Sequence, residues 1–270
     1  MPAVPDLSVA IIGVGAVGRG MRDLFPNAVL YDEPLGLGSR DSVNRCRVAF
    51  VCVPTPSLVD GACDTSIVED VVGWCESDVI VIRSTVAPGT TERLAASSDK
   101  RLVFQPEYGP GETPDHPYAH TRDIRWMVLG GPRPATSEVH ALYTKVVNSD
   151  VIIQQTDATT AELAKYMENA FLATKVTFCN EFYDIASALG VDYNELRELW
   201  LLDPRMGRSH TWVHEDDRGF GGACLPKDLD ALIAASQAAG VRPATLSAIA
   251  EANRARRGTD IHVRVNIQYG

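Results

Sequence analysis

The sequence predicts an α/β protein in which a doubly wound parallel sheet is followed by a helical domain built on one long helix. Through the first half of the chain, short β-branched runs alternate with helix-like stretches, as in βαβ units. Between Thr156 and Gly190 there is neither proline nor glycine, which is typical of a single long helix. The expected domains are residues 1–155 for the sheet, 156–257 for a helical central and dimerisation domain, and 258–270 for a tail.

Seven short apolar runs are expected to be the strands of the sheet. They cover residues 8–12, 29–31, 47–53, 78–82, 101–104, 126–129 and 151–153. Helices are expected between them where the chain carries start signals: Asp64-Thr-Ser precedes 66–75, Pro88 precedes 89–96, and Pro134 precedes 135–147.

The second half predicts helices and one final strand. The long helix would be a rod of roughly 50 Å, and its apolar residues recur every three or four positions, so at least one face is expected to be buried and to organise a homodimer. These residues are Leu163, Tyr166, Met167, Ala170, Phe171, Thr174, Phe178, Phe182, Ile185 and Leu189. Shorter helices are expected at 192–202, 226–239 and 243–256, and strict alternation predicts an edge strand at 261–269.

Composition excludes several classes of function. With 35 acidic and 25 basic side chains the formal charge is −10, so a nucleic-acid partner held through its phosphates is not expected. The first apolar run has no preceding positive charge and soon meets glycines and Arg19, which predicts neither a signal peptide nor a membrane span and favours a cytoplasmic protein. The six cysteines have no Cys-x-x-Cys spacing, and the histidine pairs at 116/120 and 210/214 favour a structural role over a metal site.

A glycine motif follows the first predicted strand and opens a helix. It reads Gly13-Val-Gly15-Ala-Val17-Gly18. Gly13 would permit the tight turn, Gly15 would let a pyrophosphate approach the backbone, and Gly18 would let helix and strand pack closely. With Val17 inside the motif, these residues predict dinucleotide binding at the helix N-terminus and a Rossmann-like sheet.

Asp32 ends the second predicted strand, 19 residues after Gly13. Its carboxylate would accept hydrogen bonds from an adenosine ribose and repel a 2′-phosphate. Glu33 follows it, and no arginine comes before Arg40, so NAD is expected rather than NADP.

The most informative stretch is Gly219-Phe-Gly-Gly-Ala-Cys224-Leu-Pro-Lys-Asp228. Three glycines in four residues would let a substrate lie against the backbone, and Pro226 marks the first turn of a helix. A thiol at that helix N-terminus beside Lys227 would be favoured as a thiolate. Cys224 is therefore expected to be a nucleophile, with an inert structural cysteine as the alternative.

Lys165 and Asn169 stand four positions apart on the long helix and would project from one face. Spacing alone favours a solvated polar stripe. The apolar neighbours Tyr166, Ala170 and Phe171 instead indicate a covered region, where a lysine is unusual.

These residues belong to a series of motifs that resembles the UDP-glucose/GDP-mannose dehydrogenase family over nearly the whole chain. The matching segments, in family order and spacing, are Gly13-x-Gly15-x-x-Gly18, Val51-Cys-Val-Pro-Thr-Pro56, Asp60-Gly61 with Asp64-Thr-Ser66, Ser84-Thr-Val-Ala-Pro-Gly-Thr90, Gln105-Pro-Glu107, Glu162-Leu-Ala-Lys165-Tyr-Met-Glu-Asn169, Asn180-Glu181, Asp203-Pro-Arg205-Met-Gly207 and Gly219 to Asp228.

The resemblance implies NAD-dependent, four-electron oxidation of the primary alcohol of a sugar to a carboxylate, through a thiohemiacetal and a thioester on the cysteine. Cys224 matches the family nucleophile. Lys165 and Asn169 would stabilise the oxyanion, and Asp228 would act with them on water.

The resemblance assigns further roles to residues of the predicted sheet and loops. Thr85 would position a water molecule or the nicotinamide side of the cofactor, Glu107 would serve as a general base, and Thr55 would line the cofactor. We also count Tyr108, Phe220 and Gly221 among the substrate-binding residues. The alternatives are that Thr55 and Thr85 cap strand ends, Glu107 is a surface carboxylate and Asp228 only stabilises a helix start.

Two departures from the family pattern leave the substrate open. After Glu251-Ala-Asn253-Arg-Ala-Arg-Arg257 only 13 residues follow, so the family's nucleotide-sugar-binding domain is expected to be absent. The loop after Glu107 reads Tyr108-Gly-Pro-Gly-Glu112 instead of the usual family pattern. A nucleotide sugar of the UDP-glucose type, a smaller sugar or nucleoside alcohol, and a site completed by a separate chain all remain open. The cations that would hold a diphosphate are Arg205, Arg208, Arg218 or Lys227.

Three functions are therefore carried forward. The first is the NAD-dependent oxidation of an alcohol to an acid through Cys224. The second is a single oxidation of the β-hydroxyacid dehydrogenase type, which needs no covalent thiol. The third is a non-catalytic subunit that binds NAD.

Overall fold

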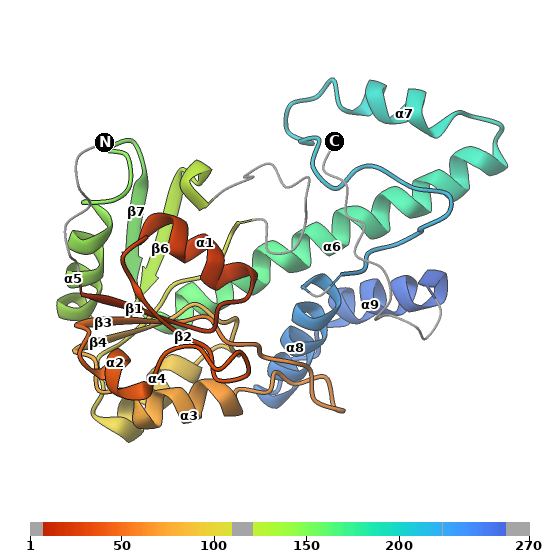
Figure 1. Cartoon of the computed structure of the whole chain (residues 1–270). Coiled ribbons are helices and arrows are strands. Elements are labelled where there is room, and N and C mark those ends of the chain that lie inside the picture. The colour runs from red at the N-terminus through yellow and green to blue at the C-terminus, as the bar shows by residue number, and fades with distance from the viewer. Residues whose placement is uncertain (1–7, 110–120, 223, 258–270) are drawn as a thin grey trace. The chain divides into compact units, whose positions relative to one another are not determined.

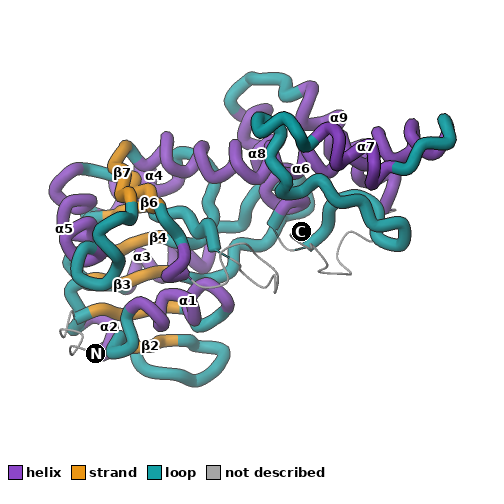
Figure 2. The backbone as a smooth tube through the Cα atoms, turned by 90° about the horizontal axis from the view of Figure 1, so that it is seen from above, coloured by secondary structure: helices purple, strands orange, loops and turns teal. Residues whose placement is uncertain are grey.

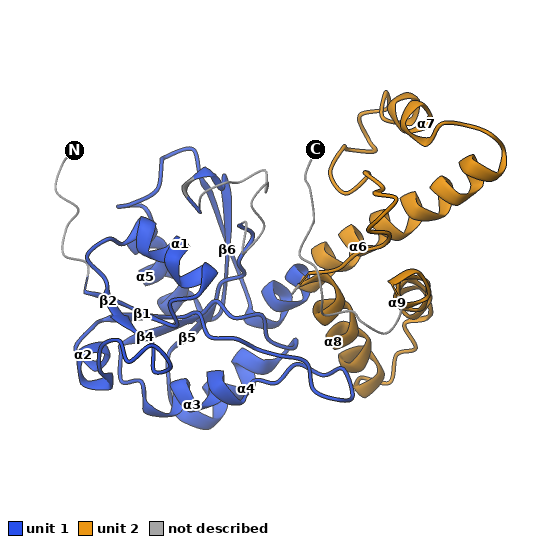
Figure 3. Ribbon diagram, turned by 45° about the vertical axis from the view of Figure 1, so that its right-hand side comes forward, with its two compact units in different colours: residues 1–112, 118–165 blue, residues 113–117, 166–270 orange. Residues whose placement is uncertain are grey.

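The computed structural model describes residues 8–109, 121–222 and 224–257. The strand predicted at 261–269 lies outside these residues. The chain divides into two compact units, and the division falls between Lys165 and Tyr166 inside a long helix (Figure 3). Each unit is described below by itself.

Unit 1 is built on a seven-stranded sheet in the order β2-β1-β3-β4-β5-β6-β7 (Figure 1). The strands are β1 (Val9–Ile12), β2 (Val29–Tyr31), β3 (Val48–Val51), β4 (Val79–Ile82), β5 (Leu102–Phe104), β6 (Trp126–Gly130) and β7 (Ile152–Thr156). Each overlaps one of the predicted apolar runs, so the expectation of a doubly wound α/β sheet is confirmed.

The sheet differs from the prediction at one junction, because β5 and β6 pair antiparallel while all other neighbours are parallel. A parallel neighbour needs a crossover connection that returns the chain to the starting edge. The described part of the β5–β6 connection includes a short 3-10 helix, Thr121–Asp123. Because the two strands are antiparallel, β6 starts at the edge of the sheet where β5 ends.

Helices cover both faces of this sheet (Figure 1). On one face α1 (Ala16–Leu24) and α5 (Arg133–Tyr143) pack on a core that includes Val9 and Ile11. The opposite face, with Ala10 and Ile12, is covered by α2 (Arg40–Asn44), α3 (Ser66–Trp74), α4 (Thr90–Ser98) and the start of α6. Alternate residues of one buried strand thus enter two different cores.

The long helix is α6, Ala158–Ala188, whose 31 residues span about 46 Å. In unit 2 it is followed by α7 (Tyr193–Trp200), α8 (Leu225–Ala238) and α9 (Ala244–Arg257). The described part of this unit contains helices and loops but no strand (Figure 2). The single long helix and the shorter ones agree with the sequence prediction.

Within the single chain, most of the large residues on the expected apolar face of α6 are exposed. Six of them, together with Leu189 directly after the helix, are called the apolar stripe; they are 39–73% exposed and comprise Leu163, Met167, Phe171, Phe178, Phe182, Ile185 and Leu189. The face that the chain covers carries small and polar side chains instead, among them Ala161, Glu162, Asn169, Ala173 and Asn180. Small residues allow neighbouring backbone to approach the helix closely, so within one chain they make the better packing face.

Two features are absent from the described residues. None of their helices combines the length and the apolar character that a membrane span requires. Nor do they contain three or more His, Cys, Asp or Glu side chains grouped so as to hold a metal ion.

Candidate functional site

Five predicted site residues of unit 1 follow the carboxyl ends of five neighbouring strands. Gly13 follows β1, Asp32 β2, Thr55 β3, Thr85 β4 and Glu107 β5. Because β1 to β5 are mutually parallel, these positions share one edge of the sheet. This edge is where doubly wound sheets bind ligands.

The three glycines of the motif are needed for different reasons. Gly13 has φ +86°, and a Cβ there would lie 2.6 Å from the carbonyl oxygen of Cys52. A Cβ on Gly18 would lie 2.0 Å from the carbonyl oxygen of Gly13, so helix α1 and the turn touch. Gly15 is the exposed N-cap of α1, and a Cβ there would meet nothing within 4 Å. The space beside Gly15 at the helix N-terminus suits a phosphate group. Val17 packs on the core of the same face.

The carboxylate of Asp32 holds the glycine turn in place. Its Oδ2 accepts a hydrogen bond of 2.8 Å from the Val14 amide, and its Oδ1 accepts one of 3.2 Å from the Leu35 amide. Arg40, remote in sequence, pairs with Glu33 and with Asp70, each at 3.5 Å. Its charge is therefore shared between two carboxylates beside the end of β2.

Thr55 and Thr85 belong to one framework. The Thr55 hydroxyl is buried and donates to the Thr85 carbonyl oxygen at 2.8 Å. Ser84 donates to the Val53 carbonyl oxygen at 2.6 Å, which ties the loops after β3 and β4 together a second time. Thr85 itself is half-buried.

Glu107 lies beside a small pocket and is held by two donors. Its Oε2 forms an ion pair with the guanidinium of Arg83, whose side chain is only 3% exposed, and its Oε1 accepts a hydrogen bond of 2.5 Å from the Gly109 amide. The pocket is lined by these two side chains together with Gln105 and Tyr143, whose hydroxyl donates to the Gln105 amide oxygen at 2.6 Å. To take a proton from water, Glu107 would have to exchange one of these donors.

Lys165 reaches the loop that carries Glu107. Its Nζ lies 5.0 Å from the centre of the Tyr108 ring, within the range of a cation–π contact. The Tyr108 ring also packs against Trp126, with centroids 5.7 Å apart. The structure thus brings together two residues that the sequence assigned to substrate binding, Lys165 and Tyr108.

In unit 2, Cys224 is the exposed N-cap of α8. Pro226 lies in the first turn, and the Asp228 amide donates to the Cys224 carbonyl oxygen at 2.8 Å. The predicted helix start is therefore present. Lys227, however, forms an ion pair of 2.6 Å with Asp228, so its charge does not act on the thiol alone.

Asp228 connects this helix start to α6. Its side chain is 2% exposed, and its Oδ2 accepts a hydrogen bond of 2.5 Å from Nδ2 of Asn169. Asn169, Asp228 and Lys227 therefore form a continuous polar chain next to the cysteine. Asn169 stands one helical turn after Lys165 on α6.

The loop before Cys224 differs from its expected use. The ring of Phe220 is buried, with 2% exposure, and a Cβ on Gly221 would lie 2.8 Å from Nη2 of Arg257. Gly221 is buried as well, and the amide and the carbonyl oxygen of Phe220 both pair with Asn253 of α9, so neither residue offers an open backbone to a substrate in this structure.

Sequence reasoning missed Glu162, which begins the motif containing Lys165. It is fully buried and accepts hydrogen bonds from the amides of Gly89 at 2.6 Å and Thr91 at 2.9 Å, where α4 starts. Burial raises the pKa of this carboxyl, and the backbone donors oppose that shift. The sequence signal that could have indicated Glu162 is an acidic residue on the face of an apolar helix that carries small residues.

The cations considered for a diphosphate are already paired. Arg205 binds Asp203 through two hydrogen bonds of 2.9 and 3.0 Å from its Nε, Arg208 pairs with Glu198 at 2.7 Å, and Arg218 with Asp184 at 2.5 Å. A diphosphate would have to compete with these carboxylates.

Comparisons with known proteins place both halves of the chain in one family. Residues 35–147 match the NAD binding domain, and residues 159–255 the central domain, of the UDP-glucose/GDP-mannose dehydrogenase family. A putative UDP-glucose 6-dehydrogenase of Bacillus subtilis is 31% identical over 91% of this chain and 60% of its own length. The GDP-mannose 6-dehydrogenase of Pseudomonas savastanoi pv. phaseolicola is 30% identical over 88% of this chain and 57% of its own length. The chain thus spans about 60% of the length of these relatives.

Solved structures give the same result for the fold. A UDP-glucose dehydrogenase from Pyrobaculum islandicum superposes with a TM-score of 0.78 at 25% identity, covering 94% of this chain and 69% of that one. A 3-hydroxyisobutyrate dehydrogenase from Mycobacterium tuberculosis superposes with a TM-score of 0.68 over 94% of both chains. Its sequence identity of 18% makes this a likeness of fold alone.

Proposed function

Because the chain belongs to the UDP-glucose/GDP-mannose dehydrogenase family, we propose that it oxidises a primary alcohol to a carboxylate with NAD, using Cys224 as a covalent nucleophile. The observation that carries the proposal is the exposed thiol of Cys224 at the first turn of α8, one turn before the buried Asn169–Asp228–Lys227 chain. A cysteine kept only for packing has no need of this position.

The overall reaction would be R–CH2OH + 2 NAD⁺ + H2O → R–COO⁻ + 2 NADH + 3 H⁺. NAD supplies the hydride acceptor for both oxidations. After the first oxidation the Cys224 thiolate adds to the aldehyde carbon and gives a thiohemiacetal. Loss of a second hydride gives a thioester, and water then cleaves its carbon–sulfur bond, releasing the acid and the thiolate.

Lys165 and Asn169 support the oxyanion steps in this proposal. A cation and an amide donor, four positions apart on one helix, suit the alkoxide of the substrate and the oxygen of the thiohemiacetal. The contact of Lys165 with the Tyr108 ring limits the positions that its ammonium group can take. Asp228 is suited to orient Asn169, since it accepts a hydrogen bond from that amide.

The thioester step needs a water molecule and a proton acceptor. Glu107 and Thr85 follow neighbouring strands, β5 and β4, at the same edge of the sheet, and we assign the general base to Glu107 and the orientation of water or cofactor to Thr85. The fixed carboxylate of Glu107 favours a positioned base over a mobile one.

The glycine turn fits NAD. The open space at Gly15 and the N-terminus of α1 suit the pyrophosphate, with Gly13 and Gly18 keeping turn and helix close. Asp32 would accept hydrogen bonds from the adenosine ribose. Thr55 would lie beside the cofactor, and its hydroxyl holds the loop after β4 through the Thr85 carbonyl oxygen. An enzyme that uses NAD and sugar nucleotides is expected in the cytoplasm.

As substrate we propose a nucleotide sugar of the UDP-glucose type, oxidised at C6, because the named relatives act on UDP-glucose or GDP-mannose. The alternative substrate is a smaller sugar or nucleoside alcohol, because Arg205, Arg208 and Arg218 already pair with carboxylates and a diphosphate would have to displace these.

We further propose a homodimer through α6. The apolar stripe runs along this helix from Leu163 and ends at Leu189, the residue after it, and it is exposed in the single chain. Contiguous exposed apolar surface of this kind marks an interaction site. A second copy of the same helix offers a matching stripe.

The proposal is tested by counting NADH. The purified protein is incubated with NAD and a panel of UDP- and GDP-hexoses, nucleosides and free sugars, while NADH and acid product are followed. We expect two NADH for each acid, and no acid from the Cys224→Ser variant. Cys46→Ser is the matched control, because the buried Cys46 thiol donates to the Ser42 carbonyl oxygen and a serine hydroxyl can replace it.

Other results decide between the remaining functions. One NADH for each product, unaffected by Cys224→Ser, would establish the single oxidation, which needs no covalent thiol. NAD binding without turnover on any compound of the panel would favour the non-catalytic subunit.

A further inference from the structure

Asn253 of α9 grips the backbone of the loop that leads to Cys224. Its side chain is 3% exposed, its Oδ1 accepts a hydrogen bond of 2.7 Å from the Phe220 amide, and its Nδ2 donates one of 2.9 Å to the Phe220 carbonyl oxygen. Both halves of the amide thus pair with one residue, as a neighbouring strand would. Only the carboxamides of Asn and Gln offer a donor and an acceptor in this fixed planar arrangement, and Gln is one methylene longer.

The glycines of the loop fit the side chains of α9. Gly219 has φ +80°, and a Cβ there would lie 2.4 Å from Oδ1 of Asn253. A Cβ on Gly221 would lie 2.8 Å from Nη2 of Arg257. The same guanidinium pairs with Asp217 at 2.8 Å. Gly219 and Gly221 therefore lie close to side chains of α9, independently of any substrate.

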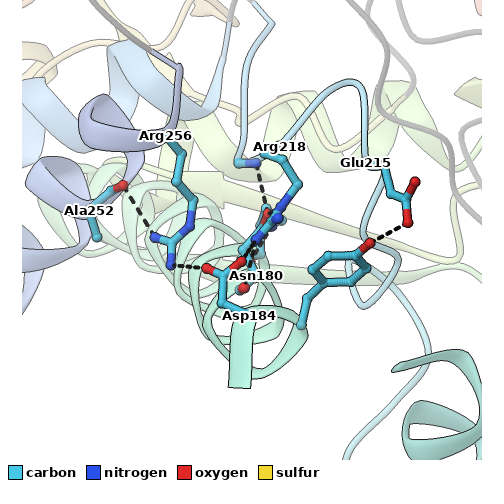
Figure 4. A network of polar contacts seen from close by, with 9 residues as sticks. Asn180, Asp184, Glu215, Arg218, Ala252 and Arg256 are labelled. Carbon is cyan, nitrogen blue, oxygen red and sulfur yellow. Dashed lines mark hydrogen bonds and ion pairs between the residues drawn. The ribbon is translucent and has the colours of Figure 1, made fainter. Parts of the chain in front are cut away.

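Helix α6 holds the loop from its other side. Oδ1 of Asn180 accepts hydrogen bonds from the Gly219 amide at 3.1 Å and from Nε of Arg218 at 2.7 Å. Arg218 continues to Asp184, which also receives a hydrogen bond of 3.3 Å from Arg256 of α9 (Figure 4). The three residues that contact the loop directly, Asn180, Asn253 and Arg257, are called the loop clamp below.

The loop is thus fixed at two points, at Phe220 by Asn253 and at Cys224 by the first hydrogen bond of α8. We propose that Asn253 is a positioning residue for Cys224: by fixing Phe220 it keeps the thiol at the N-terminus of α8, where the helix favours its thiolate. The inference rests on the proposed function only in taking Cys224 as the nucleophile. A loop released from Asn253 would let the first turn of α8 fray and would weaken that influence.

The test measures the thiol directly and needs no substrate. Asn253→Asp keeps an acceptor for the Phe220 amide but sets a carboxylate oxygen against the Phe220 carbonyl oxygen. Iodoacetamide labelling of Cys224, followed by mass spectrometry of its peptide, gives a rate at each pH. We expect the rate at pH 7 to fall at least about fivefold, with the rate–pH curve moved to higher pH.

The matched control is Ile249→Ala. Ile249 lies one helical turn before Asn253 on α9, is 7% exposed and packs in the core, so its truncation loosens the helix without removing the contacts to Phe220. We expect its labelling curve to follow that of the wild type at a temperature where circular dichroism shows both variants folded. An unchanged curve for Asn253→Asp, or an equal shift for Ile249→Ala, would overturn the proposal.

If Asn253→Asp does not fold, amide hydrogen exchange of the wild type replaces the labelling experiment. The Phe220 amide should then exchange more slowly than the amides of the exposed loop around Arg205, and equal exchange would contradict the clamp. If Asn253→Asp slows the labelling of Cys224 but the wild type oxidises no substrate, Asn253 is a positioning residue and the proposed dehydrogenase function is rejected. If the wild type oxidises a substrate but Asn253→Asp is labelled at the wild-type rate, the dehydrogenase function stands and the positioning role of Asn253 is rejected.

Discussion

At the scale of single residues, the predicted site side chains are held by partners that lie outside the sequence motifs. Glu107 depends on Arg83, which is almost completely buried. Burial opposes the charge of that guanidinium, but the nearby Glu107 carboxylate outweighs this effect and raises the pKa of Arg83. Such a pair stabilises a fold little by itself, yet removing one partner leaves a buried charge alone.

We expect Arg83→Met to destabilise the protein by about 3–5 kcal/mol, because Glu107 is left without its cation. Urea unfolding followed by circular dichroism measures the loss. The double variant Arg83→Met/Glu107→Leu should recover much of it, since no charge is then buried unpaired. A double variant as unstable as the single one would argue that Arg83 acts through packing alone.

Two cysteines should differ sharply in reactivity. Burial raises the pKa of Cys52 to about 12, whereas Cys224 is exposed at a helix start. At pH 8 we expect iodoacetamide to modify Cys224 and to leave Cys52 untouched until the protein is unfolded in urea. Peptide mapping measures both. Modification of Cys52 in the folded protein at a similar rate would contradict the burial of Cys52 directly after β3.

At the scale of elements, α6 links its neighbours through buried polar side chains. Glu162 accepts the two amides at the start of α4, and each of its oxygens has its own donor. Replacing one oxygen with an amide group would set a donor against a donor.

Glu162→Gln should therefore cost about 1–3 kcal/mol of unfolding free energy, the usual penalty for a buried group that loses its partner. Glu181→Gln is the matched control on the same helix, since Glu181 is exposed and should change stability by less than about 0.5 kcal/mol. Chemical denaturation at pH 7 measures both, and equal effects would show that Glu162 does not cap α4.

Asp184 joins α6 to α9 through Arg218 and Arg256. Burial opposes its ionisation, but hydrogen bonds from the two arginines hold its pKa below the usual value. The stabilisation is therefore present above pH 3.8 and is lost as the pH falls through the lower folded value. Because the side chain is 52% exposed, Asp184→Asn should cost under about 1 kcal/mol at pH 7.

The melting temperatures of wild type and Asp184→Asn should converge as the pH is lowered from about 5 to about 3, because protonation removes the same charge that the substitution removes. A constant difference across this range would mean that the carboxylate is not what Arg218 and Arg256 stabilise.

At the scale of the whole molecule, the sequence predicted those strands and helix starts that depend on residues adjacent in the chain. Strands such as Val79–Ile82 are continuous apolar runs, and the start of α8 is announced by Pro226, so both could be placed from local pattern. Local motifs also led to the proposal of Cys224, Lys165 and Glu107 as site residues. The short helix α2 carries too little periodic pattern to be predicted.

Contacts between distant segments could not be derived in this way. Arg83 and Glu107 are 24 positions apart, and Asn253 and Phe220 are 33 apart, so their pairing follows from the fold and not from spacing. The same holds for α6: periodicity indicates an apolar face, but it cannot tell whether the chain itself covers that face.

The exposed apolar stripe gives the last prediction. If a second copy of the chain covers it, a charge at its centre must disrupt the dimer, because a buried unpaired carboxylate is costly. Phe171 is 62% exposed in the single chain, so Phe171→Glu should leave the fold intact while shifting the mass measured by light scattering from two chains to one.

Ser187→Glu adds the same charge to the same helix and serves as the control. Ser187 is exposed and lies two positions from both Ile185 and Leu189, hence about 200° around the helix from the stripe. It should leave the mass at two chains. A monomeric wild type at about 50 μM, a concentration at which even micromolar dimers form, or a dimer that survives Phe171→Glu, would show that the stripe does not join two copies.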